Sequence, residues 1–191
     1  MKVFFTASQK GKSYFEQYYK RIVEETEIMG FLILKDDIID TKEEEYYHRL
    51  KNGGKEEYNK LYHDKLKALQ EADVCVFEAT VPSFSVGYLI AKSLEFNKPT
   101  IVLYFKDNVP YFLLGISNEK LIARNYNDSN LNKILEEAYK AASQLRNKRF
   151  NFFITPDLLN YLDETSRSNN VTKSMFIRKL ILDHRQKNRT S

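Results

Sequence analysis

The sequence predicts an α/β fold over residues 1–145, a doubly wound sheet of five mainly parallel strands, followed by a small second module over 146–191. Three observations support this. Short apolar runs rich in β-branched and aromatic residues alternate with amphipathic segments, which is typical of strands buried on both faces. Residues 66–104 contain a complete strand–loop–helix–strand unit, with strands at 73–77 and 100–104. Basic residues gather at the C-terminal end.

The other elements follow from local patterns. We expect further strands at 2–7, 31–34 and 121–126, and helices at 13–29, 87–96, 111–114 and 130–145. Ser13 is a candidate N-cap, Gly30 a stop, and Pro99 ends the helix that Gly87 opens. The highly charged segment 35–60 is predicted to be a partly helical insertion over or beside a pocket.

Two loops are candidate ligand sites, because ligands of such sheets bind outside the carboxyl ends of the strands. Their hydroxyls, lysines and backbone N–H groups at a helix N-terminus could hold a phosphate. The candidate phosphate-binding residues are Ser8, Lys10, Gly11, Ser83, Ser85 and Gly87, with Lys12 also in the first loop. The alternative is a serine-capped connection and two solvated lysines.

Four stretches carry a family resemblance: FFTASQKGK, LQEADVCVFEAT, PSFSVGY and NKPTIVLY. At similar spacing over roughly the first 145 residues, they resemble the nucleoside 2-deoxyribosyltransferase superfamily. The resemblance is greatest to the branch that hydrolyses 2-deoxynucleoside 5-monophosphates at the N-glycosidic bond. It implies a nucleotide pocket in which Ser83 matches the phosphate-contacting serine of that branch.

The resemblance also implies a changed reaction centre. The hydrolytic branch reads approximately PSxGVGYELG, with the Glu as nucleophile, whereas here Leu89 follows Tyr88 and cannot form a glycosyl–enzyme intermediate. The sugar-contacting Asp of the family falls at Lys65. Glu78 and Asp64 are the candidate substitute carboxylates. We expect a nucleotide-binding pseudoenzyme, and the alternative is an active N-glycosidase or deoxyribosyltransferase.

The C-terminal segment differs in charge and pattern. Residues 146–191 contain ten Lys/Arg and four Asp/Glu, against 20 and 22 in the rest of the chain. Such clustering indicates a polyanion-binding module, with a solvated tail as the alternative. A strand is predicted at 149–155, and helices at 157–168 and 173–184. One strand and two helices cannot bury a core alone, which predicts an intertwined dimer.

This segment resembles the ribbon–helix–helix family over 148 to about 187, in its strand length, the Pro that starts the first helix and the V-T-x-S step into the second. The resemblance implies an antiparallel ribbon of two strands in the DNA major groove. The candidate DNA-binding residues are Arg149, Asn151, Phe153, Thr172, Lys173 and Ser174. The alternative is a dimerisation element or an antitoxin-like partner binder.

Several classes of function are not supported. The single cysteine, Cys75, lies in an apolar strand, and no run of 18 apolar residues or signal peptide is present, so we expect a soluble cytoplasmic protein without membrane association. His48 and His63 lack metal-ligand spacing, and the GxGxxG fingerprint is absent, so we expect no metal or cofactor. The expected partners are DNA, a nucleotide and further copies of the chain, as a homodimer or tetramer.

Overall fold

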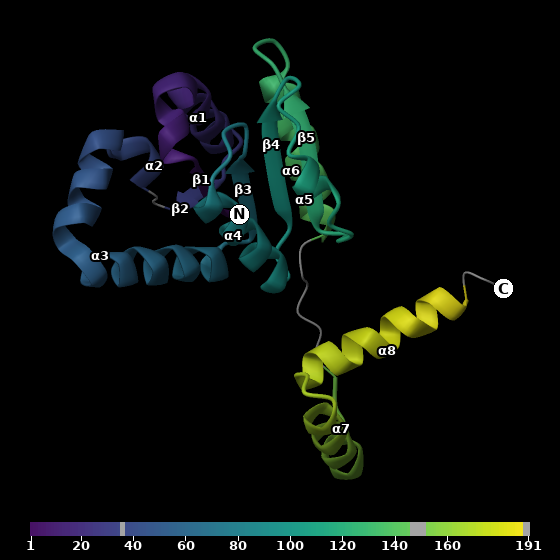
Figure 1. Cartoon of the computed structure of the whole chain (residues 1–191). Coiled ribbons are helices and arrows are strands. Elements are labelled where there is room, and N and C mark those ends of the chain that lie inside the picture. Colours follow the sequence, from purple (N-terminus) through teal and green to yellow (C-terminus); the bar gives the residue numbers. More distant parts are fainter. Residues whose placement is uncertain (35–36, 146–151, 189–191) are drawn as a thin grey trace. The chain divides into compact units, whose positions relative to one another are not determined.

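The computed structural model describes residues 1–34, 37–145 and 152–188 of the chain. It divides into two compact units, Met1–Asn147 and Lys148–Ser191 (Figure 1). Among the described helices, none combines the length and apolar character needed to cross a membrane.

The first unit contains a five-stranded sheet, which confirms the predicted α/β class. Every pair of neighbouring strands is parallel, in the order β2-β1-β3-β4-β5. The strands are β1 (Lys2–Ala7), β2 (Leu32–Leu34), β3 (Val74–Glu78), β4 (Thr100–Phe105) and β5 (Leu121–Tyr126). The helices are η1 (Gln9–Gly11), α1 (Lys12–Ile28), α2 (Asp37–Asp40), α3 (Glu43–Glu71), α4 (Phe84–Glu95), α5 (Tyr111–Leu114) and α6 (Leu131–Leu145).

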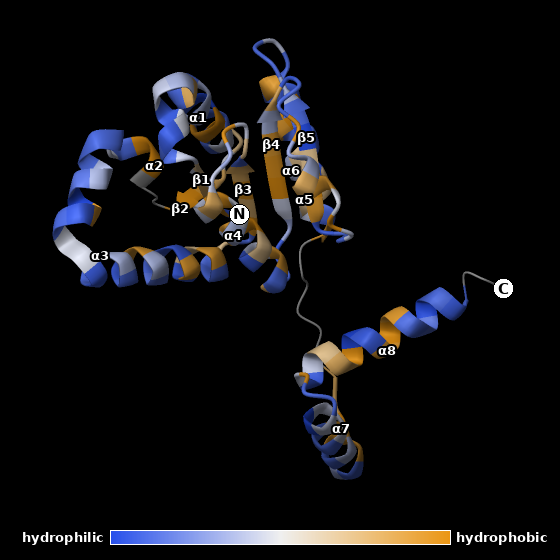
Figure 2. Ribbon diagram, viewed as in Figure 1, coloured by the Kyte–Doolittle hydropathy of each residue, from blue (hydrophilic) through white to orange (hydrophobic). Residues whose placement is uncertain are grey.

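Helices cover both faces of the sheet, and each face has its own apolar core (Figure 2). On one face α1 and α6 pack against alternate residues of the strands, whereas α4 and the end of α3 pack on the other. All five residues of β3 are buried, as expected of a central parallel strand. The strand order reverses between β1 and β3, so the two loops that follow these strands meet at the topological switch point, where such folds bind ligands.

The starts of two helices differ from the prediction. The helix expected from Ser13 begins at Lys12, directly after η1, and Gly11 occupies its N-cap position. The helix expected from Gly87 begins at Phe84, because Ser83 caps it: the Val86 N–H donates to Ser83 Oγ at 3.4 Å. This cap satisfies one of the N–H groups that have no partner within the first turn of the helix.

The second unit is a helical hairpin of α7 (Pro156–Ser168) and α8 (Lys173–Lys187). Much of the predicted strand 149–155, including Arg149 and Asn151, lies outside the described residues. Phe152, Phe153 and Ile154 form no strand in the single chain. The physical reason is that a strand needs a second strand to pair its N–H and C=O groups.

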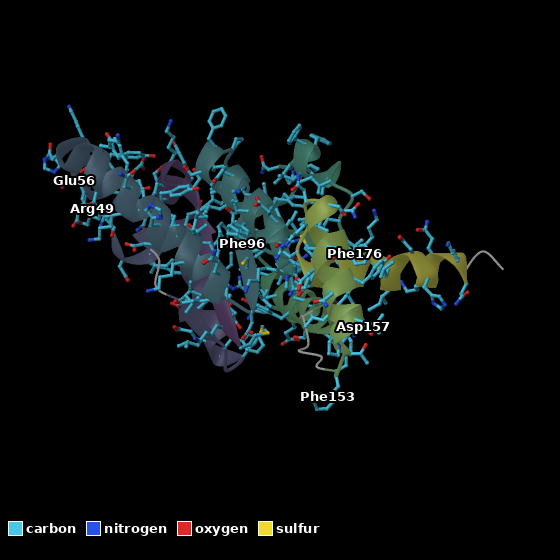
Figure 3. The ribbon with its side chains drawn as sticks, turned by 90° about the horizontal axis from the view of Figure 1, so that it is seen from below. Arg49, Glu56, Phe96, Phe153, Asp157 and Phe176 are labelled. Carbon is cyan, nitrogen blue, oxygen red and sulfur yellow. The ribbon has the colours of Figure 1, made fainter. Side chains whose placement is uncertain are left out.

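The second unit leaves most of its apolar side chains exposed. Only Leu162 and Ser166 of α7 are buried, and no described residue of α8 is. Phe153 is fully exposed and projects away from the ribbon (Figure 3). The other large exposed apolar residues are Phe152, Leu158, Leu159, Tyr161, Met175, Leu180, Ile181 and Leu182. A helical pair with so little buried surface is not stable alone.

Candidate functional site

A cavity of about 360 Å³ opens at the carboxyl ends of β1 and β3. Its volume lies in the range that proteins use for one small ligand. The first wall comes from β1 and η1, the second from the N-terminal half of α4, and the third from α3. The lining residues are Thr6, Ala7, Ser8, Gln9, Lys10, Tyr46, Tyr47, Leu50, Leu61, Lys65, Pro82, Ser83, Phe84, Ser85, Val86 and Leu89.

The polar side of the cavity combines hydroxyls, a lysine and a helix N-terminus. Ser8 is buried, and its carbonyl oxygen accepts from the Gly11 N–H at 3.0 Å, which shapes the turn after β1. Lys10 is an exposed residue at the rim. Ser83 and Ser85 lie at the start of α4, whose N–H groups and dipole favour a negative charge.

Three predicted phosphate-binding residues lie outside the lining. Gly11 is buried where a Cβ would collide with the Tyr19 hydroxyl and with Val81 Cγ2, so its role is to allow close packing of two loops. Gly87 lies inside α4. Lys12 is buried and its Nζ donates to the carbonyls of Ile39 at 2.9 Å and Thr41 at 2.7 Å. Lys12 therefore ties α1 to the segment before α3 and does not face a ligand.

Leu89, the position where the resemblance implies a nucleophile, lines the cavity, and the candidate substitute carboxylates do not. Leu89 lines the cavity and is buried. Glu78 is fully buried outside the lining, since strand alternation turns its side chain toward α1, away from α4. Asp64 is exposed on α3, and its neighbour Lys65 lines the cavity instead. None of the described lining residues is an aspartate or glutamate.

The apolar wall from α3 was not predicted from the sequence. Tyr46, Tyr47, Leu50 and Leu61 lie within or next to a highly charged segment, yet all four line the cavity. The rings of Tyr46 and Tyr47 pack edge to face at 5.3 Å between centroids. The sequence signal that could have predicted this wall is the spacing of Tyr46, Tyr47 and Leu50, which places three apolar residues within about one helical turn.

Gly54 divides α3 into two arms that line the same cavity. Its φ of 57° and ψ of −142° are non-helical and lie in a region that glycine tolerates and other residues avoid. Arg49 and Glu57 form an ion pair across the kink at 3.0 Å. Tyr46, Tyr47 and Leu50 precede the kink, whereas Leu61 and Lys65 follow it (Figure 1).

We expect Gly54→Ala to destabilise the fold by about 1–3 kcal/mol, because a Cβ strains this backbone conformation. The kink would straighten, and the part of the apolar wall that contains Tyr46 and Tyr47 would move away from the cavity. Chemical denaturation of Gly54→Ala and of Asn52→Ala, an exposed helical neighbour of the kink, measures the difference. Equal stability of the two variants would show that the kink is not strained.

Glu78 has an unusual electrostatic environment beneath the two loops. Its Oε1 accepts from the hydroxyl of Thr80, from the Thr80 N–H at 3.4 Å and from the Tyr126 hydroxyl at 3.0 Å. Among the described residues, Oε2 is buried without a hydrogen-bond partner. Burial raises the pKa of the Glu78 carboxyl to about 7, although the bonds from Thr80 and Tyr126 act in the opposite direction.

No family model matches the chain. Three curated relatives are provisionally named 2′-deoxynucleoside 5′-phosphate N-hydrolase 1. The relative from Methanosarcina barkeri is 29% identical over 138 residues, which are 71% of this chain and 83% of the relative. The one from Thermofilum pendens is 27% identical over 147 residues, covering 70% and 92%. The one from Methanosarcina mazei is 28% identical over 127 residues, covering 66% and 75%.

Among solved structures, a CMP N-glycosidase from Clostridium botulinum is similar, at a TM-score of 0.48 and 17% identity over 72% of this chain and 97% of that one. In sequence, most of the chain is therefore similar to proteins named 2′-deoxynucleoside 5′-phosphate N-hydrolase 1.

Proposed function

We propose that this protein is a dimeric DNA-binding regulator whose deoxyribosyltransferase-like domain binds a nucleotide without ordinary glycosidase turnover. The observation that carries the proposal is the composition of the cavity wall. It keeps serines, a lysine and a helix N-terminus for a phosphate, but Leu89 replaces the nucleophile and no described lining residue is a carboxylate. A cavity of this kind can bind an anion but offers no carboxylate to attack the anomeric carbon.

The two sides of the cavity support a nucleotide as the ligand. Ser83, Ser85 and Lys10 suit a phosphate, because their donors meet at a helix N-terminus. The opposite wall presents Tyr46 and Tyr47, whose rings suit the flat face of a base. A ligand with one anionic end and one aromatic end matches both sides, whereas inorganic phosphate matches only the first.

We expect the cavity to bind 2′-deoxynucleoside 5′-monophosphates and Lys10→Met to weaken that binding about tenfold, the effect of losing one charge-assisted hydrogen bond. Isothermal titration calorimetry with a panel of the four monophosphates measures the affinity. Lys20→Met is the matched control, since Lys20 is a lysine of α1 that pairs with Glu16 outside the cavity. Equal affinities for the two variants would contradict a phosphate site at Lys10.

The second unit supports the DNA-binding part of the proposal. Its apolar surface is exposed in the single chain, which a second copy would bury, and its residues 146–191 are strongly basic. Thr172 caps α8 by accepting from the Met175 N–H at 3.2 Å, and this exposed N-terminus suits a backbone phosphate. Lys173 pairs with Asp163 at 2.7 Å, which orients α8 against α7.

We expect DNA affinity to fall steeply as salt rises, because each phosphate contact releases bound counterions. Arg149→Ala should weaken specific binding by about 1–3 kcal/mol and relax the preference at one base, as for an arginine that reads guanine. Fluorescence anisotropy against salt concentration measures both effects, with Lys133→Ala in α6 as the control. Failure of the wild-type protein to bind any DNA at low salt would contradict this part, and a co-purifying protein partner would then favour an antitoxin-like role.

The second candidate function is an active N-glycosidase with a DNA-docking tail, and the names of the relatives favour it. Glu78 or Asp64 would then have to supply the carboxylate. In the structure both lie outside the cavity lining, so one of them would have to move. Chromatographic detection of free base from deoxynucleoside monophosphates tests this candidate. Release that Glu78→Gln abolishes would support it, and release at background would contradict it.

A further inference from the structure

Glu78 is a buried ionisable group that the proposed nucleotide site does not use directly. It is the last residue of β3, and none of its side chain is exposed. Its neighbours in the sheet are Ala7 of β1 and Leu103 of β4. An ionised carboxylate in such surroundings is costly unless it is paired with a cation or fully hydrogen-bonded. A residue of this kind at the switch point of the sheet calls for a functional explanation.

The contacts of Glu78 lead to both loops of the cavity. On one side, Glu78 Oε1 holds Thr80, the residue from which the chain runs to Pro82 and Ser83 in the cavity wall. Thr80 Oγ1 also accepts from the Phe105 N–H at 2.8 Å, so the start of this loop is bonded to β4 as well. A shift of the carboxyl would therefore move the segment that leads to the capping serine of α4.

On the other side, Tyr19 connects Glu78 to the first loop. The Tyr19 hydroxyl lies beside the Glu78 carboxyl and donates to the carbonyl of Ser8 at 3.4 Å. Gly11 packs against the same hydroxyl and against Val81 of the second loop. Glu78, Tyr19 and Thr80 thus form a polar cluster beneath the point where the two loops touch. Its geometry depends on which groups donate and which accept.

We propose that Glu78 is a proton-dependent positioning residue: its neutral form holds the two loops in the arrangement that binds the ligand, and its ionisation loosens them. This inference rests on the proposed function in taking the cavity as the ligand site. Three donor groups converge on Oε1, so Oε2 is the oxygen that carries the proton. A phosphate bound in the cavity adds negative charge, which favours the neutral carboxyl further.

The groups that face Glu78 come from three directions. They are Tyr19 of α1, Tyr126 of β5 and Thr80 of the following loop. Burial raises the pKa values of both tyrosines well above the ordinary range, so neither ionises near neutral pH. Glu78 is therefore the group of this cluster that changes charge near pH 7.

The direction of the pH effect follows from linkage. Because the folded-state pKa of about 7 exceeds the ordinary value of 4.5, the folded protein binds the proton more tightly than the unfolded chain. The resulting stabilisation is complete below about pH 4.5 and is lost as the pH rises through about 7. We expect the loops to loosen over the same pH range, as the pH rises through about 7.

Glu78→Gln is the central variant, because an amide has the shape of the neutral carboxyl and does not ionise. The first measurement uses no ligand. Hydrogen exchange rates of the backbone amides in 8–11 and 79–83 are measured between pH 6 and pH 8.5 and corrected for the intrinsic rates. In the wild-type protein we expect both segments to exchange about tenfold faster at the higher pH, which corresponds to one pKa unit. In Glu78→Gln we expect no change. Equal pH dependence in the two proteins would overturn the inference.

The second measurement is calorimetry with deoxynucleoside monophosphates in buffers of different ionisation enthalpy. If binding raises the pKa of Glu78 by one unit, the wild-type protein takes up about half a proton more per site than Glu78→Gln near pH 7.5. The variant also serves as a correction for titration of the phosphate itself. Binding with identical proton uptake overturns the inference and leaves the proposed function standing. If the loops respond to pH but the protein binds no nucleotide, the proposed function is overturned and the inference about Glu78 stands.

Tyr126→Phe keeps the inference testable should Glu78→Gln fold poorly. It removes one donor to Oε1, which stabilises the ionised form, so we expect the midpoint of loop loosening to move to higher pH. A midpoint that stays in place or moves to lower pH in Tyr126→Phe would show that another group controls the loops.

Discussion

Leu180→Asp is expected to convert the protein to a monomer and to abolish DNA binding at micromolar concentration. Leu180 lies on α8 and is 53% exposed in the single chain, next to the similarly exposed Ile181. In the proposed dimer these side chains meet their copies. Loss of about 1.5–3 kcal/mol of apolar burial at each of two symmetric positions weakens association at least 100-fold. The added carboxylates weaken it further, since an unpaired charge is costly to bury.

Sedimentation equilibrium measures the oligomeric state, and anisotropy with labelled DNA measures binding. Leu180→Met is the matched control, because it keeps an apolar side chain of similar volume and should remain dimeric. DNA binding should be lost together with the dimer, because the predicted ribbon consists of two strands, one from each chain. A monomeric Leu180→Asp protein that binds DNA with unchanged affinity would contradict the ribbon assignment. A variant that remains dimeric would place the dimer interface elsewhere.

Leu89→Glu is expected to give N-glycosidase activity well above that of the wild-type protein, for which the proposed function predicts only background release of base. Leu89 lies in the cavity wall at the position where the resemblance places the nucleophile. Base release from deoxynucleoside monophosphates should rise at least about 100-fold above the wild-type rate, a small part of the roughly 10⁶-fold that loss of a nucleophile costs in other enzymes. The resemblance implies an acid at position 65, where this chain has a lysine, so Leu89→Glu with Lys65→Asp should release base faster still.

Leu89→Gln is the control for this experiment, since it has the size and polarity of glutamate without a nucleophilic oxygen. Both substitutions bury a polar group in a cavity wall, and we expect both to destabilise the fold by about 1–3 kcal/mol. Thermal melts measure that loss separately from activity. Brisk base release by the wild-type protein would contradict the premise and establish the hydrolase alternative. Equal rates in Leu89→Glu and Leu89→Gln would show that position 89 cannot serve as the nucleophile.

The fold was predictable because its evidence is local and repeated. The runs that became β1, β3, β4 and β5 are short, apolar and separated by helices, a pattern that is typical of a buried parallel sheet. Helix starts were harder. Gly87 looked like the first residue of a helix, but Ser83 competes successfully by accepting from a free N–H of the first turn, so α4 begins at Phe84.

The candidate site was predictable only in part. The loops after β1 and β3 and the helix that follows the second loop lie at the carboxyl ends of strands, and this place follows from the order of the elements. Five residues of these segments line the cavity: Ser8, Lys10, Ser83, Ser85 and Leu89. The wall that contains Tyr46 and Tyr47 could not be placed in this way. Its position depends on the kink at Gly54, a single backbone conformation that no periodic pattern records.

The sequence by itself determined the parallel sheet, the two loops that follow β1 and β3, the leucine at position 89 and the basic C-terminal segment. These features follow from residue type and from spacing along the chain. The tertiary structure decided which carboxylates reach the cavity. Glu78 is close to Ser83 in sequence, but strand alternation turns it to the opposite face of the sheet, where burial raises its pKa to about 7. Which face a side chain occupies, and how much water remains around it, depends on the packed neighbours and not on the sequence separation.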